Sequence, residues 1–135
     1  MRLHILHASS ERDFDAVSEA LSQLQPSGLV VSSDTFFATH SEQLAALAIR
    51  HALPAIHQSR DFALAGGLMS YAGSFAESHR QAGIQTGRIL KGEKAANLPV
   101  QQVTKVELFI NLKTAKTLGI ALPLPLIGRA DQVIE

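Results

Sequence analysis

The sequence contains no cysteine and no tryptophan, and it contains only one tyrosine. The lack of cysteine excludes disulfide bonds, thiolate metal ligands and cysteine nucleophiles, and it leaves the redox compartment open. An excess of either charge is also missing, because 12 basic side chains balance 12 acidic ones. General nucleic-acid binders carry a basic excess, so we expect no nucleic-acid partner.

Long hydrophobic runs are absent as well. No apolar stretch approaches the roughly 20 residues that a membrane-spanning helix needs. The N-terminal stretch "MRLHILHASSERDFD" does not resemble a signal peptide, because His4 and His7 interrupt its apolar residues and acids follow directly. As written, the sequence therefore predicts a cytoplasmic protein if Met1 is the true start.

The composition that remains is that of a globular domain. The chain has 135 residues, enough for one ordinary domain and too few for two full ones. Hydrophobic residues make up 46% of it, which is enough to build a core and argues against disorder.

Short apolar stretches alternate with amphipathic ones in the first part of the chain. The pattern predicts strands at 2–7, 28–34 and 54–57, and helices at 10–25 and 39–53. The continuous apolar run of the second strand predicts burial on both faces. Ser10 with Asp13, and Thr39 with Glu42, have the spacing of a capping box at the two helix starts.

The later part continues the same alternation. It predicts a helical turn at 60–67, a strand at 68–71, a long helix at 74–91, a strand at 103–111 and a helix at 112–119. Ser74 with Glu77 has capping-box spacing, and Asn111 can cap the helix that follows it. Gly83 and Gly87 lie four residues apart in the long helix, which indicates close packing against a neighbour. The predicted fold class is α/β, a parallel βαβ sheet flanked by helices.

Polar residues follow several of the predicted strands, and ligands collect at the carboxyl ends of strands in open α/β sheets. Asp34 follows the second strand, where an acid can pair with an ammonium group or a metal ion. The alternative is that Asp34 caps the next turn. Ser70, Tyr71 and Ser74 follow or end the fourth strand, where hydroxyls and a helix N-terminus can hold a carboxylate. The alternative is that Ser74 only caps its helix and Tyr71 only packs.

Catalytic and cofactor signatures are weak. On a strand, the spacing of His4 and His7 puts them on opposite faces, and His51 and His57 lack an organised third ligand, so we predict no metal site. The sequence has neither the G-x-S-x-G order nor the glycine fingerprints of nucleotide sites. A receiver-type phosphorylation site would need further acids after the first strand. Composition leaves a Ser-His-Asp triad open, but we predict no enzyme and no cofactor.

Four stretches carry a family resemblance: "HALPAIH", "FALAGGLMSY", "GRILKGEKAANLPVQQVTKVELFINLKTAKTLGI" and "RADQVIE". From about Gly28 to Glu135 the sequence resembles the C-terminal part of an ABC-transporter substrate-binding protein. The family is the type I periplasmic binding group that includes tryptophan- and phenylalanine-binding lipoproteins.

The resemblance implies a protein with two α/β lobes joined by a hinge, which clamps a small ligand without chemistry and delivers it to an ABC permease. It implies a periplasmic or membrane-anchored extracytoplasmic location. Residues 1–59 then correspond to part of the second lobe. Residues 60–135 correspond to a crossover segment, a strand and helix of the first lobe, and the C-terminal strand and helices.

The resemblance also implies which residues bind the ligand. Asp34, Thr35 and Phe36 match the second-lobe side of the cleft, and Ser70, Tyr71 and Ser74 match the first-lobe side. This division suits an amino-acid zwitterion or another small polar molecule. Thr35 stands where amino-acid binders often have asparagine, and Ala72 where many relatives have glycine, and both differences bear on the ligand.

A chain that matches only the later part of such a protein exposes apolar surface and strand edges, so we expect either a homo-oligomer, of which element swapping is one form, or a poorly stable protein. Two alternatives to transport stay open at this point. One is a cytosolic ligand-sensing or interaction module that reuses the fold, and the other is a non-functional product of a truncated gene.

Overall fold

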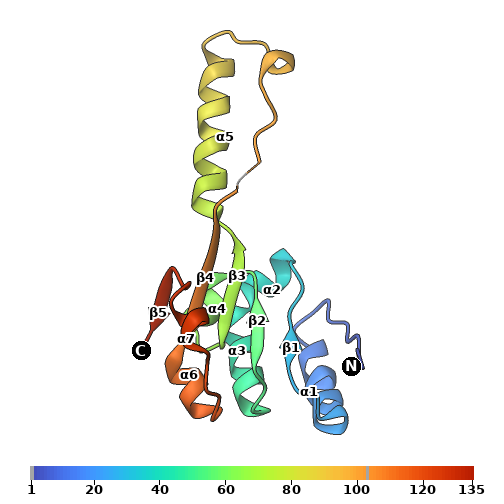
Figure 1. The fold of residues 1–135 in the computed structure, drawn as a ribbon. Helices are drawn as coiled ribbons and strands as arrows, with labels where there is room; N and C mark the ends of the chain where they lie inside the picture. Colours follow the sequence, from blue (N-terminus) through green and yellow to red (C-terminus); the bar gives the residue numbers. More distant parts are fainter. Residues whose placement is uncertain (1, 103) are drawn as a thin grey trace. The chain divides into compact units, whose positions relative to one another are not determined.

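The computed structural model describes residues 2–102 and 104–135 (Figure 1). The contacts within the chain divide it into two compact units, which we describe separately. The first unit contains the residues up to Tyr71 together with Leu108–Glu135, and the second contains Ala72–Glu107. The assignment of 1–59 to part of a second lobe, and of 60–135 to a crossover segment, a first-lobe strand and helix and the C-terminal elements, stays a prediction.

The described strands form one five-stranded sheet in which the spatial order follows the sequence. They are β1 (Leu29–Val30), β2 (Ala55–His57), β3 (Met69–Gly73), β4 (Val106–Asn111) and β5 (Gln132–Ile134). The pairs β1–β2, β2–β3 and β4–β5 are parallel. The predicted α/β class with a parallel sheet and flanking helices is confirmed.

One pair of neighbouring strands in the sheet, β3 and β4, is antiparallel rather than parallel. The carbonyl of Leu68 accepts a hydrogen bond from Asn111 N at 2.9 Å, and the carbonyl of Lys105 accepts one from Ser74 N at 2.9 Å. As β3 advances from 68 to 74, its partner therefore runs back from 111 to 105, so β3 and β4 are antiparallel. Through these two strands the chain leaves the first unit and returns to it.

The helices begin and end close to the predicted signals. They are α1 (Asp13–Leu24), α2 (Thr35–Thr39), α3 (Ser41–Arg50), α4 (Arg60–Leu64), α5 (Phe75–Leu90), α6 (Leu112–Thr117), α7 (Leu124–Ile127) and a 3-10 turn, η1 (Ala95–Asn97). Ser59 caps α4 by accepting a hydrogen bond from Asp61 N. Gly66, at φ +110°, follows the end of α4, and the backbone of Gly67 lies so close to the Phe62 ring that an added Cβ would overlap it.

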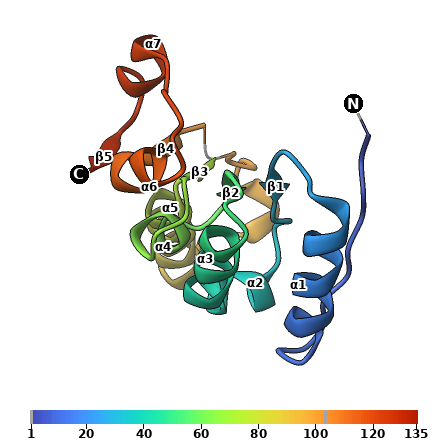
Figure 2. The same cartoon turned by 90° about the horizontal axis from the view of Figure 1, so that it is seen from below.

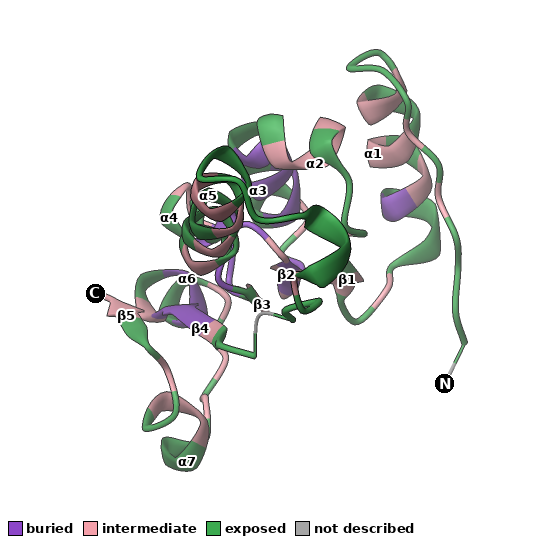
Figure 3. Cartoon of the chain, turned by 90° about the horizontal axis from the view of Figure 1, so that it is seen from above, coloured by how far each residue is buried: buried purple, intermediate pink, exposed green. Residues whose placement is uncertain are grey.

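The core of the first unit lies where α3 and α4 pack on β2. Its buried members are Leu44, Ala45 and Ala48 of α3, Ala55 of β2 and Phe62 of α4. Figure 3 shows the buried segments gathered on α3 and the central strands. A second cluster, made of Leu21, Leu47 and Leu53 with Leu6 and Val17 beside it, joins α1 to α3 (Figure 2).

Several local predictions for the first unit are wrong. Residues 2–7 form no strand; Leu3 and Ile5 are exposed, because an alternating pattern defines an apolar face but supplies no partner strand. β1 is not buried on both faces, since the side chain of Val30 is 80% exposed at the edge of the sheet. Thr39 does not cap α3, because it is already the last residue of α2 and its hydroxyl donates to the Phe36 carbonyl.

The second unit is built around α5 and buries few residues. Among the residues that the structure describes in this unit, only Ser74 is buried. It caps α5 as predicted, because its Oγ accepts a hydrogen bond from Glu77 N at 3.4 Å. The close packing expected at Gly83 and Gly87 is wrong, since no heavy atom of the described residues lies within 4 Å of a Cβ added at either position. Ion pairs brace the exposed helix instead, including Arg80 with Glu77 at 2.6 Å.

The C-terminal segment completes the first unit. Asn111 caps α6 as predicted, because its Oδ1 accepts a hydrogen bond from Thr114 N at 3.0 Å. Its Nδ2 also donates to the Ala63 carbonyl at 2.9 Å, which ties α6 to α4. The sequence reading missed β5, whose start is held to β4 by Asp131: its carboxylate accepts from Leu108 N, and its own N–H donates to the Leu108 carbonyl.

Candidate functional site

The carboxyl ends of β1, β2 and β3 gather polar residues at one edge of the first unit's sheet. Asp34 comes after β1, His57 ends β2, and Ser70 lies in β3. His57 and Ser70 are direct register partners in neighbouring strands. Asp34 follows β1 and Ser70 lies in β3, so the two residues belong to strands that β2 separates.

Asp34 is the N-cap residue of α2, which is the alternative role predicted for it. Its Oδ1 accepts a hydrogen bond from Phe36 N at 2.7 Å, so this carboxylate oxygen caps the helix. The side chain of Asp34 is exposed, as is that of Thr35. The carboxylate keeps a second oxygen with which to meet a cation, so capping and ligand binding are compatible roles.

Phe36 packs into an aromatic cluster at the start of α2. Its ring centroid lies 4.4 Å from that of His40 and 5.6 Å from that of Phe14 on α1. His40 Nδ1 lies 2.7 Å from the Phe36 carbonyl, and Nε2 lies 3.0 Å from Glu11 Oε1. The Phe36 carbonyl and then the Glu11 carboxylate raise the pKa of His40. The half-buried Phe36 thus holds α2 against α1 through its ring.

His57 and Gln58 lie at the same edge, and sequence reasoning missed both as site residues. The side chain of His57 is buried among the strand ends and meets the Phe62 ring edge-on, with centroids 5.7 Å apart. Gln58 accepts a hydrogen bond from the hydroxyl of Ser33, which joins the loop after β1 to the loop after β2. The carboxyl-end rule, applied to the predicted strand 54–57, would have identified them.

The remaining predicted residues differ in accessibility. Ser70 is 1% exposed, so its hydroxyl belongs to the interior of the sheet, whereas Tyr71 is 59% exposed. Ser74 belongs to the second unit, where it is buried and caps α5. The structure thus brings Asp34, Thr35 and Phe36 together at the start of α2, whereas Ser70 and Tyr71 lie in β3 and Ser74 caps α5.

The described residues contain no group of three or more His, Cys, Asp or Glu side chains that could hold a metal ion. A serine and a histidine do meet where α1 approaches the end of α3, with Ser18 Oγ 2.8 Å from His51 Nε2. This contact lies between two helices rather than at the strand ends, and we assign it to helix packing. Within residues 2–102 and 104–135, no helix combines the length and apolarity that crossing a bilayer requires.

A protein-family model described as "ABC transporter substrate binding protein" matches residues 1–134. No curated protein matches the chain significantly.

Solved structures share the fold at low identity. A conserved domain protein from Vibrio cholerae O1 biovar El Tor is 21% identical, with a TM-score of 0.79, and the match covers 90% of this chain. An ABC domain from Streptococcus pneumonia, solved in complex with L-Trp, is 23% identical over 89% of this chain, with a TM-score of 0.77. A ligand-free, open substrate-binding protein with adhesive properties from Clostridium difficile is 20% identical over 89% of this chain, with a TM-score of 0.63. In each case the match spans 41% of the other protein's chain.

Proposed function

The chain belongs to the family of ABC transporter substrate-binding proteins, and on this premise we propose that it serves as the solute-binding component of an ABC uptake transporter, or as a part of one. The match to the family model over residues 1–134 is the observation that carries this proposal. Proteins of this family bind substrates and are in general not enzymes, which agrees with our prediction of binding without chemistry.

The proposed ligand is a small amino-acid-like or other polar organic molecule. Asp34 is the proposed partner of an ammonium group. Its carboxylate is exposed where β1 ends, and capping α2 uses only one of its two oxygens, so the other oxygen can accept from the ammonium group. We propose that Thr35 and Phe36 flank the ligand on this side, and that Ser70, Tyr71 and Ser74 serve the carboxylate side. One solved structure with this fold is a complex with L-Trp, so aromatic amino acids are the first ligands to test.

The proposed partner is an ABC permease, and the proposed location is extracytoplasmic, as is usual for this family. Residues 1–59 then contribute to the second lobe of a two-lobed binding protein. Residues 60–135 supply the crossover segment, a strand and helix of the first lobe, and the C-terminal elements. This lobe assignment agrees with a match that spans 41% of each solved relative.

Replacing Asp34 with asparagine separates the two roles of this side chain. Asparagine is as good a helix N-cap as aspartate, so Asp34→Asn should leave the thermal transition unchanged. Removing the charge should weaken binding of an ammonium ligand by about tenfold or more, since hydrogen bonds to charged groups are worth about 1.5–3 kcal/mol. Isothermal calorimetry measures this, after a thermal-shift screen of the amino acids and small organic acids has identified a ligand.

Asp15→Asn is the matched control, because Asp15 is an exposed acid in the first turn of α1. It should leave the affinity unchanged. Equal affinities of Asp34→Asn and the unaltered chain would remove Asp34 from the site. A screen in which no amino acid or organic acid raises the melting temperature, for this chain or for one extended at its N-terminus, would count against the proposed function itself.

A further inference from the structure

His40 connects two elements beside the candidate ligand site. Its ring packs on Phe36 of α2 and on Phe14 of α1, with centroid distances of 4.4 and 5.9 Å. Its Nδ1 lies 2.7 Å from the Phe36 carbonyl, and its Nε2 lies 3.0 Å from the Glu11 carboxylate. The ring therefore joins the turn before α1 to the helix that Asp34 caps.

Both ring nitrogens of His40 face groups that accept hydrogen bonds. A carbonyl oxygen and an ionised carboxylate have no proton to donate. Thr39 Oγ1 lies 3.2 Å from Nδ1, and it adds a further acceptor because its own proton is directed to the Phe36 carbonyl at 2.9 Å. A neutral imidazole donates from one nitrogen only, so the doubly protonated, charged ring is the form that satisfies this geometry.

The electrostatic surroundings favour the same form. The charged side chains at the facing ends of α1, α2 and α3 are Glu11, Arg12, Asp13, Asp15, Asp34 and Glu42. Of these, Glu11 contacts the ring and raises the pKa of His40, after the larger effect of the Phe36 carbonyl and against desolvation. In return, His40 and then the Gln43 side chain lower the pKa of Glu11.

Loss of the proton breaks one of the two contacts. If Nδ1 keeps its hydrogen, the lone pair of Nε2 faces the carboxylate of Glu11, whose side chain is 64% exposed and can turn into solvent. If Nε2 keeps the hydrogen instead, Nδ1 no longer binds the Phe36 carbonyl. In either case the ring no longer joins Glu11 to α2.

The short helix α2 depends on contacts of this kind. It has five residues, none of them buried, and a helix of this length is not stable by itself. The N–H of Phe36 binds Asp34 Oδ1 at 2.7 Å, and the carbonyl of the same residue binds the His40 ring. A change at His40 therefore reaches the residue whose N–H Asp34 holds.

We propose that Glu11, Phe36 and His40 form a proton-controlled latch on α2. The charged ring fixes the start of α2 and the neutral ring releases it, so ligand affinity at Asp34 falls as the pH rises. The sign follows from the geometry, because both contacts exist in the protonated form and one of them is lost on deprotonation. The effect on affinity rests on the ligand site proposed above.

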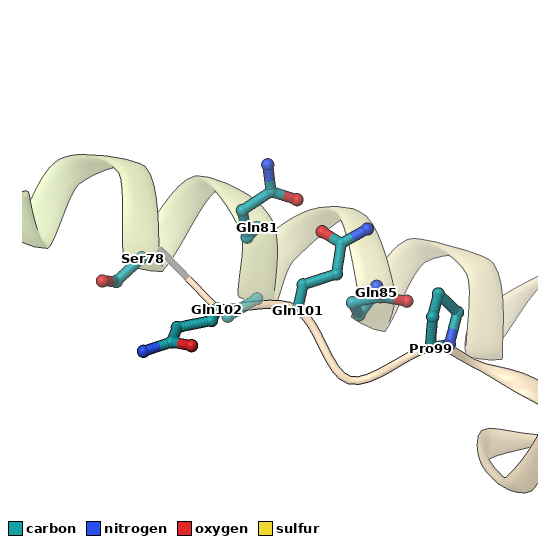
Figure 4. Close-up of a pocket in the computed structure, with 7 residues that line it drawn as sticks. Ser78, Gln81, Gln85, Pro99, Gln101 and Gln102 are labelled. Carbon is teal, nitrogen blue, oxygen red and sulfur yellow. The ribbon is translucent and has the colours of Figure 1, made fainter. Parts of the chain in front are cut away.

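A pocket in the second unit provides an internal reference for a pH titration. It has a volume of about 450 Å³ and lies between α5 and the segment 99–102 (Figure 4). None of its described lining residues is titratable, and four are glutamines: Gln81, Gln85, Gln101 and Gln102. Gln81 binds Glu77, and Arg80 followed by Gln81 lowers the pKa of Glu77 to about 2. The NH₂ signals of these glutamines should therefore not follow the titration of His40.

NMR titration of the ligand-free full chain between about pH 5 and 9 tests the latch. The Cε1–H signal of His40, identified with His40→Gln, and the backbone N–H signal of Phe36 should share one midpoint. Above it, exchange of the Phe36 and Ala38 amides with solvent should accelerate about threefold or more relative to an unstructured amide at the same pH. The Ala45 amide, in the core on α3, should keep its protection because the opening is local.

Glu11→Gln removes the charge that faces Nε2. It should lower the midpoint of His40 by about half a pH unit, which is the value of an exposed ion pair. Glu19→Gln, at an exposed acid of α1, is the matched control and should leave the midpoint unchanged. A Phe36 signal that titrates independently of His40, or a midpoint that Glu11→Gln does not move, would overturn the proposal.

Calorimetry with L-tryptophan, about one pH unit below and above the midpoint, tests the effect on binding. The affinity should be about threefold lower above the midpoint for the unaltered chain, and equal on both sides for His40→Gln. Equal affinities for the unaltered chain would overturn the control of binding by His40. If L-tryptophan binds at neither pH, it is not the ligand of the proposed site, whereas the latch is decided by the ligand-free titration.

Discussion

Two histidines in the first unit occupy opposite electrostatic environments. Burial lowers the pKa of His57 below its ordinary value of 6.5, against a weaker opposing contribution from the Ser32 backbone. His57 Nδ1 accepts from Ser59 N at 3.3 Å, so the neutral ring carries its proton on Nε2. The pKa of His40 is raised above 6.5 by the Phe36 carbonyl and by Glu11. The neutral form of His57 and the charged form of His40 are thus the ones that the fold stabilises.

These shifts predict opposite pH dependences of stability. The unfolded chain binds a proton at His57 more readily than the folded chain does, so the contribution of His57 is present above pH 6.5 and is lost as the pH falls through its lowered pKa. The contribution of His40 is present below pH 6.5 and is lost as the pH rises through its raised pKa. Urea unfolding between pH 5 and 8 measures both.

The variants His57→Gln and His40→Gln test these two pH dependences, and each serves as the control for the other. The stability difference between the unaltered chain and His57→Gln should shrink toward acid pH, and the difference for His40→Gln should shrink toward alkaline pH. Parallel pH profiles for both variants would contradict the environments described here.

At the scale of the secondary-structure elements, most helix starts could be predicted because their signals are local. Ser74 and Asn111 cap the helices that follow them, as expected from residue type and spacing alone. Ser10 and Asp13 form only half of the predicted capping box. Asp13 accepts a hydrogen bond from Ser10 N at 2.8 Å, but α1 begins at Asp13, and its N-cap residue, Arg12, makes no side-chain cap. The prediction that Thr39 caps α3 is wrong because Thr39 is the last residue of α2, a helix that was not predicted.

Strands and candidate site residues were harder to predict, because both depend on neighbours that are distant in the sequence. Residues 2–7 have the alternation of a strand but no partner, whereas β5 is a strand because β4 lies beside it. Asp34 at a helix start could be predicted from its position after an apolar run. The burial of Ser70 could not, because it depends on the elements that cover β3.

Asn111 joins two elements and should be costly to replace. Its Oδ1 caps α6 and its Nδ2 binds the Ala63 carbonyl, all within a buried environment. Asn111→Ala removes the cap, worth about 1 kcal/mol, and leaves a buried carbonyl unpaired at about 1–3 kcal/mol. We therefore expect a loss of about 2–4 kcal/mol in the free energy of unfolding, measured by urea denaturation.

Two further variants sharpen this test. Asn111→Asp keeps the capping oxygen but loses the donor to the Ala63 carbonyl, so a substantial loss should persist. Asn97→Ala, in the exposed turn η1, should change stability by less than about 0.5 kcal/mol. If Asn111→Ala were as harmless as Asn97→Ala, the link between α6 and α4 would have no energetic weight.

At the scale of the whole molecule, apolar side chains remain uncovered in both units. The most exposed include Leu3, Val30, Leu90, Val100 and Leu124, each at least 77% accessible. β1 and β5 also lie at the edges of the sheet, where unpaired backbone groups favour association. We therefore expect the isolated chain either to self-associate or to have a low melting temperature.

Light scattering coupled to size-exclusion chromatography, followed by a thermal melt, checks this expectation. We expect a mass above the 14.5 kDa of one chain, or a broad transition at low temperature. A single species of 14.5 kDa with a sharp and high thermal transition would refute it.

The antiparallel junction between β3 and β4 has a consequence for how the chain can be rebuilt. The strand that leaves for the second unit and the strand that returns are joined by the hydrogen bond between Ser74 N and the Lys105 carbonyl. The intervening residues thus form an insertion whose two ends are already hairpin partners. In engineering terms the second unit is an interchangeable cassette, since a short turn or a foreign domain with adjacent termini can bridge the same two positions.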